Sequence, residues 1–224
     1  MSQMFYAFEG TDGSGKSSMT KYAGNYLTEH GVPNLVVESY PRDPESMFLR
    51  DLWIQKKVPD EMILLIVLEL RKRILMNQII PALLSGKIVI SDRWHDTTWA
   101  YQGDGMGIDA SLIEYMMRRF DHGIIPESIT PFYRQWLADQ IENYTTVFLD
   151  VSLETSRLRV GRRSTDKDAF EKDGDEFFLK VAHGFSHRTW HRVRSGNSVI
   201  RIDANKSKEE VEAKVRDAFL HFIP

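Results

Sequence analysis

A glycine-rich run near the start of the chain has the residue types that bind phosphate groups. Residues 10–17, Gly-Thr-Asp-Gly-Ser-Gly-Lys-Ser, match the pattern G-x-x-x-x-G-K-[ST] at every fixed position. In such a loop, backbone N–H groups surround phosphate oxygens, and the following helix adds its positive N-terminal end. Lys16 would contact the β- and γ-phosphates, and the Ser17 hydroxyl would bind Mg²⁺. We therefore predict a nucleoside-triphosphate site built from Gly10, Thr11, Asp12, Gly13, Ser14, Gly15, Lys16, Ser17 and Ser18.

The phosphate loop alone is compatible with a kinase, a hydrolase or a nucleotide switch. A guanine-specific switch needs an aspartate two residues after Asn-Lys, to accept the N–H groups of guanine. In this chain Asn205-Lys206 is followed by Ser207 and then Lys208. An ammonium group cannot accept those hydrogen bonds, so the sequence disfavours a guanine switch.

Composition excludes several other classes of protein. The 29 basic and 32 acidic residues give a net charge of −3, which argues against binding to a nucleic-acid polymer. The chain has no cysteine, which excludes disulfides, thiolate metal sites and cysteine nucleophiles. The longest apolar run, residues 62–68, is far shorter than the roughly 20 residues of a membrane span. The start of the chain does not resemble a signal peptide. We expect a soluble, cytoplasmic protein with no membrane partner.

The elements that would position the phosphate loop alternate between strands and helices. Strand-like runs cover residues 4–8, 35–37, 87–91, 145–151 and 198–202. Helical patterns cover residues 16–30, which end at Gly31, and residues 60–84, for which Asp60 is a suitable N-cap. A capping box from Ser207 to Glu210 opens the final helix. Short apolar strands between helices predict one α/β domain over residues 1–224, with a five-stranded parallel sheet in a three-layer P-loop fold.

Two further patterns have simple structural interpretations. His183, His187 and His191 share one helix face, but Arg188 follows His187 where a zinc protease has its glutamate base. We expect a surface stripe of histidines. Residues 103–107, Gly-Asp-Gly-Met-Gly, lack the spacing of a dinucleotide-binding loop and are expected to form a turn.

The run that follows the third predicted strand indicates a family. Residues 92–103, Asp-Arg-Trp-His-Asp-Thr-Thr-Trp-Ala-Tyr-Gln-Gly, resemble the D-R-[YH]-x-D-S-x-x-A-Y-Q-G signature of thymidylate kinases. Residues 41–44 resemble the T-R-E-P run of that family, and Arg71 has the spacing of its substrate-binding helix. Residues 168–171 and 177–178 resemble the region at and after its lid, and residues 202–204 resemble its last strand and adenine-side loop. With the phosphate loop, the resemblance extends in order over most of the chain.

The resemblance implies transfer of the γ-phosphoryl group of ATP to dTMP, with Mg²⁺, in a homodimeric enzyme. It also implies roles for individual residues: Asp12 at the acceptor 3′-hydroxyl, Arg42 and Arg93 at the 5′-phosphate, Arg71 at thymine O4, Thr97 near the deoxyribose, Gln102 facing the base, Tyr101 among the substrate-binding residues, Asp92 ordering Mg²⁺ through water, and Ala204 near the adenine. A guanidinium fork suits a phosphate group, which fits the two arginines at the 5′-phosphate.

A lid is expected at about residues 153–171. Thymidylate kinases place a transition-state arginine either in the phosphate loop or in the lid. The loop position is Gly13 in this chain, so the resemblance implies a lid arginine. Among the four arginines of this segment, we favour Arg162 or Arg163.

Two departures from the family pattern bear on function. Val67 stands where the family has a base-stacking phenylalanine, which weakens the argument for strict thymine selectivity. The connection over residues 125–144 is longer than usual, and Thr130-Pro131 predicts an extra helix at about residues 131–143. Three alternatives therefore stay open: a kinase of other or several deoxynucleoside monophosphates, a deoxynucleoside kinase, and a nucleotide-binding module without activity. The pair Arg42 and Arg93 disfavours a free nucleoside as acceptor.

Overall fold

The centre of the molecule is a five-stranded sheet in which every strand pair is parallel. The computed structural model describes residues 3–122, 125–161 and 174–223. The strands are β1 (Phe5–Glu9), β2 (Asn34–Val37), β3 (Ile88–Asp92), β4 (Thr145–Asp150) and β5 (Val199–Asp203). They lie in the order β2-β3-β1-β4-β5. The predicted α/β fold with a five-stranded parallel sheet is confirmed.

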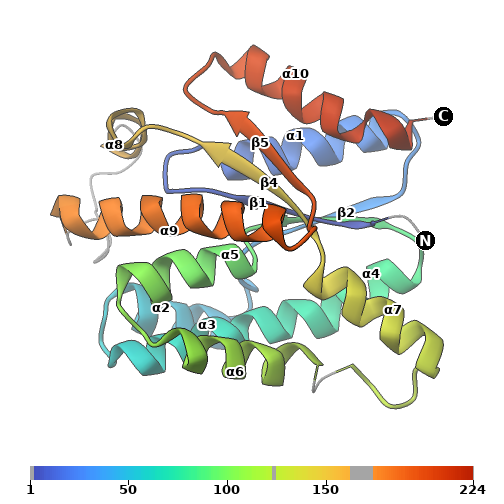
Figure 1. Cartoon of the computed structure of the whole chain (residues 1–224). Coiled ribbons are helices and arrows are strands. Elements are labelled where there is room, and N and C mark those ends of the chain that lie inside the picture. Colours follow the sequence, from blue (N-terminus) through green and yellow to red (C-terminus); the bar gives the residue numbers. More distant parts are fainter. Residues whose placement is uncertain (1–2, 123–124, 162–173, 224) are drawn as a thin grey trace.

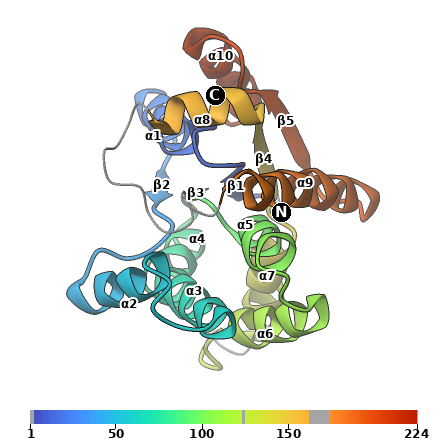
Figure 2. The same cartoon turned by 90° about the vertical axis from the view of Figure 1, so that its left-hand side faces the viewer.

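Helices cover both faces of the sheet (Figure 1). They are α1 (Lys16–Glu29), α2 (Pro44–Ile54), α3 (Asp60–Ile74), α4 (Ile80–Leu84), α5 (His95–Thr98), α6 (Ala110–His122), α7 (Pro131–Glu142), α8 (Leu153–Gly161), α9 (Gly174–Arg194) and α10 (Lys208–Phe219). Figure 2 shows that α2, α3 and α6 lie together along one side of the molecule. None of the helices in the described ranges is long and apolar enough to cross a membrane.

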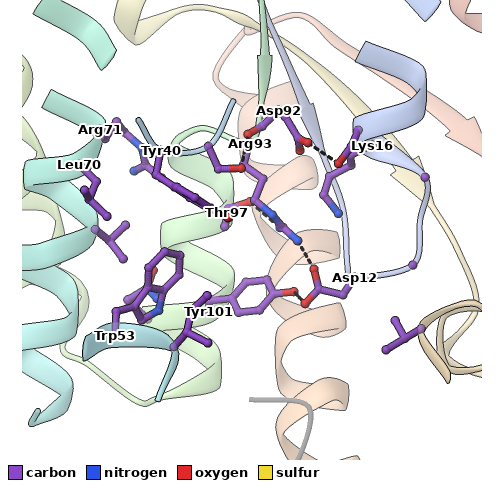
Figure 3. A pocket seen from close by; sticks show the side chains of 18 residues that line it. Asp12, Lys16, Tyr40, Trp53, Leu70, Arg71, Asp92, Arg93, Thr97 and Tyr101 are labelled. Carbon is purple, nitrogen blue, oxygen red and sulfur yellow. Dashed lines mark hydrogen bonds and ion pairs between the residues drawn. The ribbon is translucent and has the colours of Figure 1, made fainter. Parts of the chain in front are cut away.

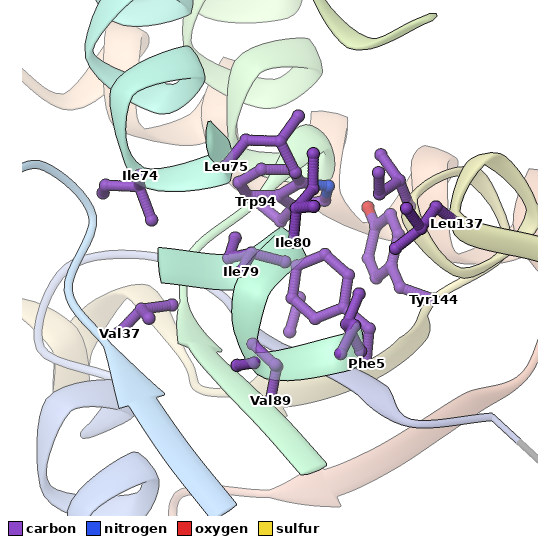
Figure 4. Close-up of a cluster of buried hydrophobic side chains, with 14 of the residues drawn as sticks. Phe5, Val37, Ile74, Leu75, Ile79, Ile80, Val89, Trp94, Leu137 and Tyr144 are labelled. Atoms are coloured by element: carbon purple, nitrogen blue, oxygen red, sulfur yellow. The ribbon is translucent and has the colours of Figure 1, made fainter. Parts of the chain in front are cut away.

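Alternation along β1 divides the core between the two faces of the sheet. Tyr6 and Phe8 point to α1 and α10, where Phe219 packs against both rings. Phe5 points to the opposite face and packs against Trp94 and Tyr144, together with side chains of α4 and α7 (Figure 4). Both faces of the sheet are therefore buried, as the apolar runs of its strands indicate.

Helix ends follow the sequence signals closely, with one correction. Ser207 and Glu210 form the predicted capping box of α10, and Thr130 is the N-cap of α7 with proline at its first position. Asp60 was predicted as an N-cap, but Pro59 occupies that position and Asp60 begins α3. Pro59 has the extended conformation of an N-cap, and the Asp60 carboxylate then lies in the first turn, at the positive end of the helix.

Two expected elements differ from the structure because π-helical turns are present. The helix expected over residues 60–84 contains a π-helical segment, Leu75–Ile79, between α3 and α4. Residues 103–107 were predicted as a turn. Trp99–Gly105 is π-helical and continues α5, so the turn begins only at Met106, and Gly107 has a left-handed φ of +77°. A Cβ on Gly105 would lie 2.7 Å from the Phe177 ring, and one on Gly184 of α9 would lie 2.9 Å from the Ala100 Cα. The glycines thus permit close packing of this segment against α9, which outweighs their preference for turns.

Candidate active site

A cavity of about 310 Å³ lies where β1 and β3 end, between the phosphate loop and helices α2 and α3. Ligand sites in parallel sheets form at the carboxyl ends of the strands. The cavity brings together twelve of the residues predicted from the sequence: Asp12, Gly13, Gly15, Lys16, Ser17, Val67, Arg71, Asp92, Arg93, Thr97, Tyr101 and Gln102.

The phosphate loop has the backbone conformation that its glycines allow. Gly13 and Gly15 have φ angles of +78° and +95°, in the left-handed region, and Gly15 is the N-cap of α1. The Lys16 ammonium group donates to the Thr11 carbonyl at 2.7 Å and to Ser14 Oγ at 3.3 Å. Burial, followed by the nearby Arg93 guanidinium, lowers the pKa of Lys16 to about 7. The loop therefore holds a buried amine beside a helix N-terminus.

Arg93 connects the two sides of the cavity (Figure 3). Its guanidinium group forms an ion pair with Asp12 and donates to the Gly10 carbonyl and Thr97 Oγ1, each at 3.1 Å. Tyr101 donates its hydroxyl to the second Asp12 oxygen at 2.8 Å. Burial acts to raise the pKa of Asp12, but Arg93 and Lys16 outweigh burial and hold this pKa below its ordinary value. Arg93 is thus a fixed cation with its fork held in one orientation.

The side-chain oxygens of Ser17, at the start of α1, and Asp92, at the end of β3, form a small polar site. Ser17 donates its hydroxyl to Asp92 Oδ2 at 2.5 Å, across 75 residues of sequence. A hydroxyl and a carboxylate are the hard ligands that Mg²⁺ prefers. These residues fit the metal site expected from the phosphate-loop motif.

The far end of the cavity holds the residues expected on the acceptor side. Arg71 of α3 is 6% exposed, although the residues after it in the sequence are also basic. It donates to Thr98 Oγ1 at 2.6 Å, and its guanidinium lies 5.3 Å from the centre of the Trp94 ring. Val67 and Gln102 also line this end and are buried. It combines an apolar wall with polar groups able to recognise a flat heterocycle.

The other predicted residues of the described ranges do not line the cavity. Arg42, in the loop between β2 and α2, has a side chain that is 60% exposed and forms an ion pair with Glu38 four residues earlier. Ala204 is buried in the core under α10. Those near the cavity but outside its lining are Gly10, Thr11, Ser14 and Ser18.

The first part of the predicted lid lies directly on the phosphate loop. Ser156 of α8 donates its hydroxyl to the Asp12 carbonyl at 2.5 Å, and a Cβ on Gly13 would lie 2.5 Å from the Ser156 carbonyl oxygen. Arg159 Nη1 reaches the Gly13 carbonyl at 3.4 Å, whereas Arg157 forms an ion pair with Asp175. Arg162 and Arg163, the lid arginines favoured from the sequence, lie outside the described residues.

Sequence reasoning missed several residues of the site. Six of them line the cavity: Ser39, Tyr40, Trp53, Ile54, Leu70 and Val160. A seventh, Glu9, lies beneath the site and is completely buried. It accepts hydrogen bonds from the backbone N–H groups of Trp94 (2.7 Å) and Thr97 (3.3 Å), and from Thr97 Oγ1 (2.5 Å). The sequence did contain a signal for Glu9: it is a charged residue at the end of an apolar strand, just before the phosphate loop.

Glu9 gives the fold a specific pH dependence. Burial, and then the neighbouring Asp96 carboxylate, raises the pKa of Glu9 from 4.5 to about 7. The folded protein therefore binds this proton more tightly than the unfolded chain does. This contribution to the free energy of unfolding is fully present below about pH 4.5 and is lost as the pH rises through about 7. In Glu9→Gln, which has no such proton, we expect a smaller decline of unfolding free energy with pH, measured by urea unfolding between about pH 5 and pH 8.

A matched control for this measurement is Glu29→Gln at the exposed end of α1. That variant should keep the wild-type slope. A Glu9→Gln variant with the same pH slope as the wild type would show that another group causes the decline.

The histidine stripe lies at the surface of α9, as expected. His183, His187 and His191 are all exposed, and the Nε2 atoms of the last two are 3.1 Å apart. The described parts of the chain contain no group of three or more potential metal ligands.

Comparison with known proteins agrees with this geometry. The family model described as thymidylate kinase matches residues 8–130, which include the phosphate loop and the Asp92–Arg93 run. A thymidylate kinase of Polaromonas sp. strain JS666 is 31% identical, over 98% of this chain and 97% of the relative. Those of Nitrosospira multiformis and Carboxydothermus hydrogenoformans are 30% and 31% identical, over 94% and 92% of this chain and the same shares of each relative. The chain belongs to the thymidylate kinase family.

Proposed function

We propose that this protein transfers the γ-phosphoryl group of ATP to dTMP, giving dTDP. The observation that carries the proposal is that one cavity contains the phosphate loop and two further cations, Arg93 beside the loop and Arg71 on the far side. The phosphate loop would hold the ATP phosphates, and the far end would hold the acceptor. Arg93 lies between them, at the place where two phosphate groups must approach.

The chemistry needs positioning and positive charge more than proton transfer. An oxygen of the acceptor phosphate attacks the γ-phosphorus, and the bond from the γ-phosphorus to the bridging oxygen of ADP breaks. A phosphate dianion already has an unprotonated oxygen, so this step requires no general base. Lys16 and Arg93 would neutralise charge on the transferring group, and the ion pair with Asp12 keeps the Arg93 fork in place. Asp12 and Tyr101 would contact the acceptor sugar side.

Mg²⁺ fits the pair Ser17 and Asp92, whose oxygens meet at the open edge of the phosphate loop. Ser17 would bind the ion directly, and Asp92 would hold it through water. When bound, the ion supplies charge neutralisation between the β- and γ-phosphates. Arg162 and Arg163 remain the proposed sources of the transition-state arginine in the lid, and Arg159 is a third candidate because it reaches the loop carbonyl of Gly13.

A second candidate function is a kinase with a broader range of monophosphate acceptors. The observation that favours it is Val67, an aliphatic side chain at the acceptor end of the cavity. It offers no aromatic face to a thymine ring.

The experiment that tests both functions measures ADP release from Mg-ATP with dTMP, dUMP, dCMP, dGMP, AMP and thymidine as acceptors. We expect turnover with dTMP, because Arg71 and Gln102 present polar groups to a pyrimidine, and weaker turnover with dUMP, because it lacks the 5-methyl group that the apolar lining would contact. Comparable rates with several monophosphates would replace the first proposal with the second. Activity on thymidine would indicate a nucleoside kinase, and ATP binding without turnover of any acceptor would indicate a module without activity.

The homodimer implied by the family stays a prediction, as does the cytoplasmic location. Exposed apolar side chains on neighbouring helices support the dimer. They include Phe48 of α2, Met62 and Leu65 of α3, and Tyr115 of α6, on the side of the molecule where these helices lie together (Figure 2).

A further inference from the structure

The acceptor end of the cavity has an aromatic wall on a different helix from the one expected. Val67 of α3 offers only a small aliphatic side chain, but Trp53, in the last turn of α2, lines the same cavity. Figure 3 shows the Trp53 indole beside Tyr101, on the side of the cavity that also holds Leu70 and Arg71. A large aromatic residue thus stands near the position where the family's phenylalanine is missing.

Packing places Trp53 and Val67 in one cluster. Trp53 is half-buried and packs against the apolar group that contains Ile63, Val67 and Phe177. Tyr40 meets its ring edge-on, with ring centres 6.4 Å apart and an interplanar angle of 87°. The indole Nε1 is buried and has no hydrogen-bond partner among the described residues, where packing against apolar side chains holds the ring. Val67 and Trp53 therefore border the same part of the cavity, where a flat ligand could pack.

We propose that Trp53 supplies the aromatic surface on which the pyrimidine base of the acceptor packs, replacing the phenylalanine that other family members have at the position of Val67. This inference rests on the proposed function and names the residue that restores base affinity in this chain. An indole has a larger face than a phenyl ring, and an aromatic contact adds about 1 kcal/mol to area burial, or about fivefold in affinity. A small residue at position 67 leaves room for a large one at position 53. Such paired exchanges of large and small side chains are tolerated in protein cores because the total volume is conserved.

Steady-state kinetics of three variants test the proposal: Trp53→Leu, Trp53→Phe, and the double variant Trp53→Leu with Val67→Phe. We expect Trp53→Leu to raise KM for dTMP about fivefold while KM for ATP stays unchanged. Trp53→Phe keeps an aromatic ring and should stay within about twofold of the wild type. The double variant removes the aromatic ring from α2 and places one on α3. It should recover most of the lost affinity, because the base again has an aromatic ring to pack against.

Direct binding gives a readout that a packing role alone would not change. Addition of dTMP to the wild type should quench part of the tryptophan fluorescence, and Trp53→Phe should abolish that change. Trp190→Phe removes a tryptophan on the exposed surface of α9 and should retain the change.

The outcomes separate this inference from the proposed function. If wild-type protein turns over no acceptor, the proposed function fails. If dTMP is phosphorylated but Trp53→Leu leaves KM for dTMP unchanged, the proposed function stands and the role of Trp53 is overturned. A double variant as weak as Trp53→Leu would also overturn it, because an aromatic ring on α3 would then not substitute for one on α2.

Discussion

Replacement of Arg93 by alanine is expected to lower kcat/KM for dTMP by about 10³-fold. Arg93 would donate charge-assisted hydrogen bonds to the acceptor and transferring phosphates, and two such bonds at about 2 kcal/mol each correspond to this loss. The substitution also leaves the half-buried Asp12 carboxylate without its ion-pair partner. Initial rates at varied dTMP, with ATP saturating, measure the effect.

The matched control is Arg118→Ala on α6, whose exposed side chain forms an ion pair with Glu114 and does not line the cavity. We expect this variant to change kcat/KM by less than about threefold, since exposed ion pairs contribute less than about 1 kcal/mol. Affinity for ATP should fall much less than affinity for dTMP in Arg93→Ala. The loop loses the ion pair at Asp12 and the hydrogen bond to the Gly10 carbonyl, but the Lys16 amine and the start of α1 stay in place. Equal losses for ATP and dTMP would contradict the assignment of Arg93 to the acceptor.

The second large effect is expected for Lys16→Met, with a fall in kcat of about 10²–10³-fold. A preorganised cation at the transferring phosphoryl group has an effect of this order. Methionine keeps the length and apolar stem of the side chain but removes the charge. Single-turnover rates with bound ATP separate this loss from any change in ATP affinity. A variant with unchanged single-turnover rates would show that Lys16 contributes only to binding.

Lys16 also predicts a proton that moves when ATP binds. The pKa of Lys16 is lowered to about 7 in the free protein, so at about pH 8 most of the amine is neutral. ATP phosphates beside the amine favour its charged form and raise that pKa, so binding takes up a proton. Isothermal titration calorimetry in two buffers of different ionisation enthalpy measures this uptake, and Lys16→Met should abolish it.

Local sequence signals predicted those parts of the fold and site in which neighbouring residues act together. The phosphate loop, the capping box of α10 and the strand that ends at Asp92 each depend on a short run of residues, and the structure contains all three. The meeting of Asp12 with Arg93 is a long-range contact. Parallel strands bring the two residues together because their carboxyl ends lie at one edge of the sheet, but the sequence assigned both to the acceptor only through the family resemblance.

The remaining parts of the site depend on contacts between elements whose orientation no local pattern specifies. Trp53 reaches the cavity because α2 packs beside α3, and nothing in its own neighbourhood indicates a ligand. Arg42 lies in a run that resembles a binding motif, and its side chain pairs with Glu38, four residues earlier, outside the cavity lining. Gly103 and Gly105 belong to a run with turn character, but Gly105 packs closely against α9 and both lie in the π-helical segment. For Trp53 and for these glycines, a tertiary contact decides between conformations that the sequence permits.

The close contact between Gly13 and α8 has a consequence for how such enzymes can diverge. Any side chain at position 13 would collide with the Ser156 carbonyl, so an arginine there requires α8 to move away from the loop. A gene that acquired this single substitution would encode a protein whose loop and following helix no longer fit together. The two placements of the transition-state arginine are therefore separated by a steric barrier. Passage from one to the other must begin with changes in the helix that lies over the loop.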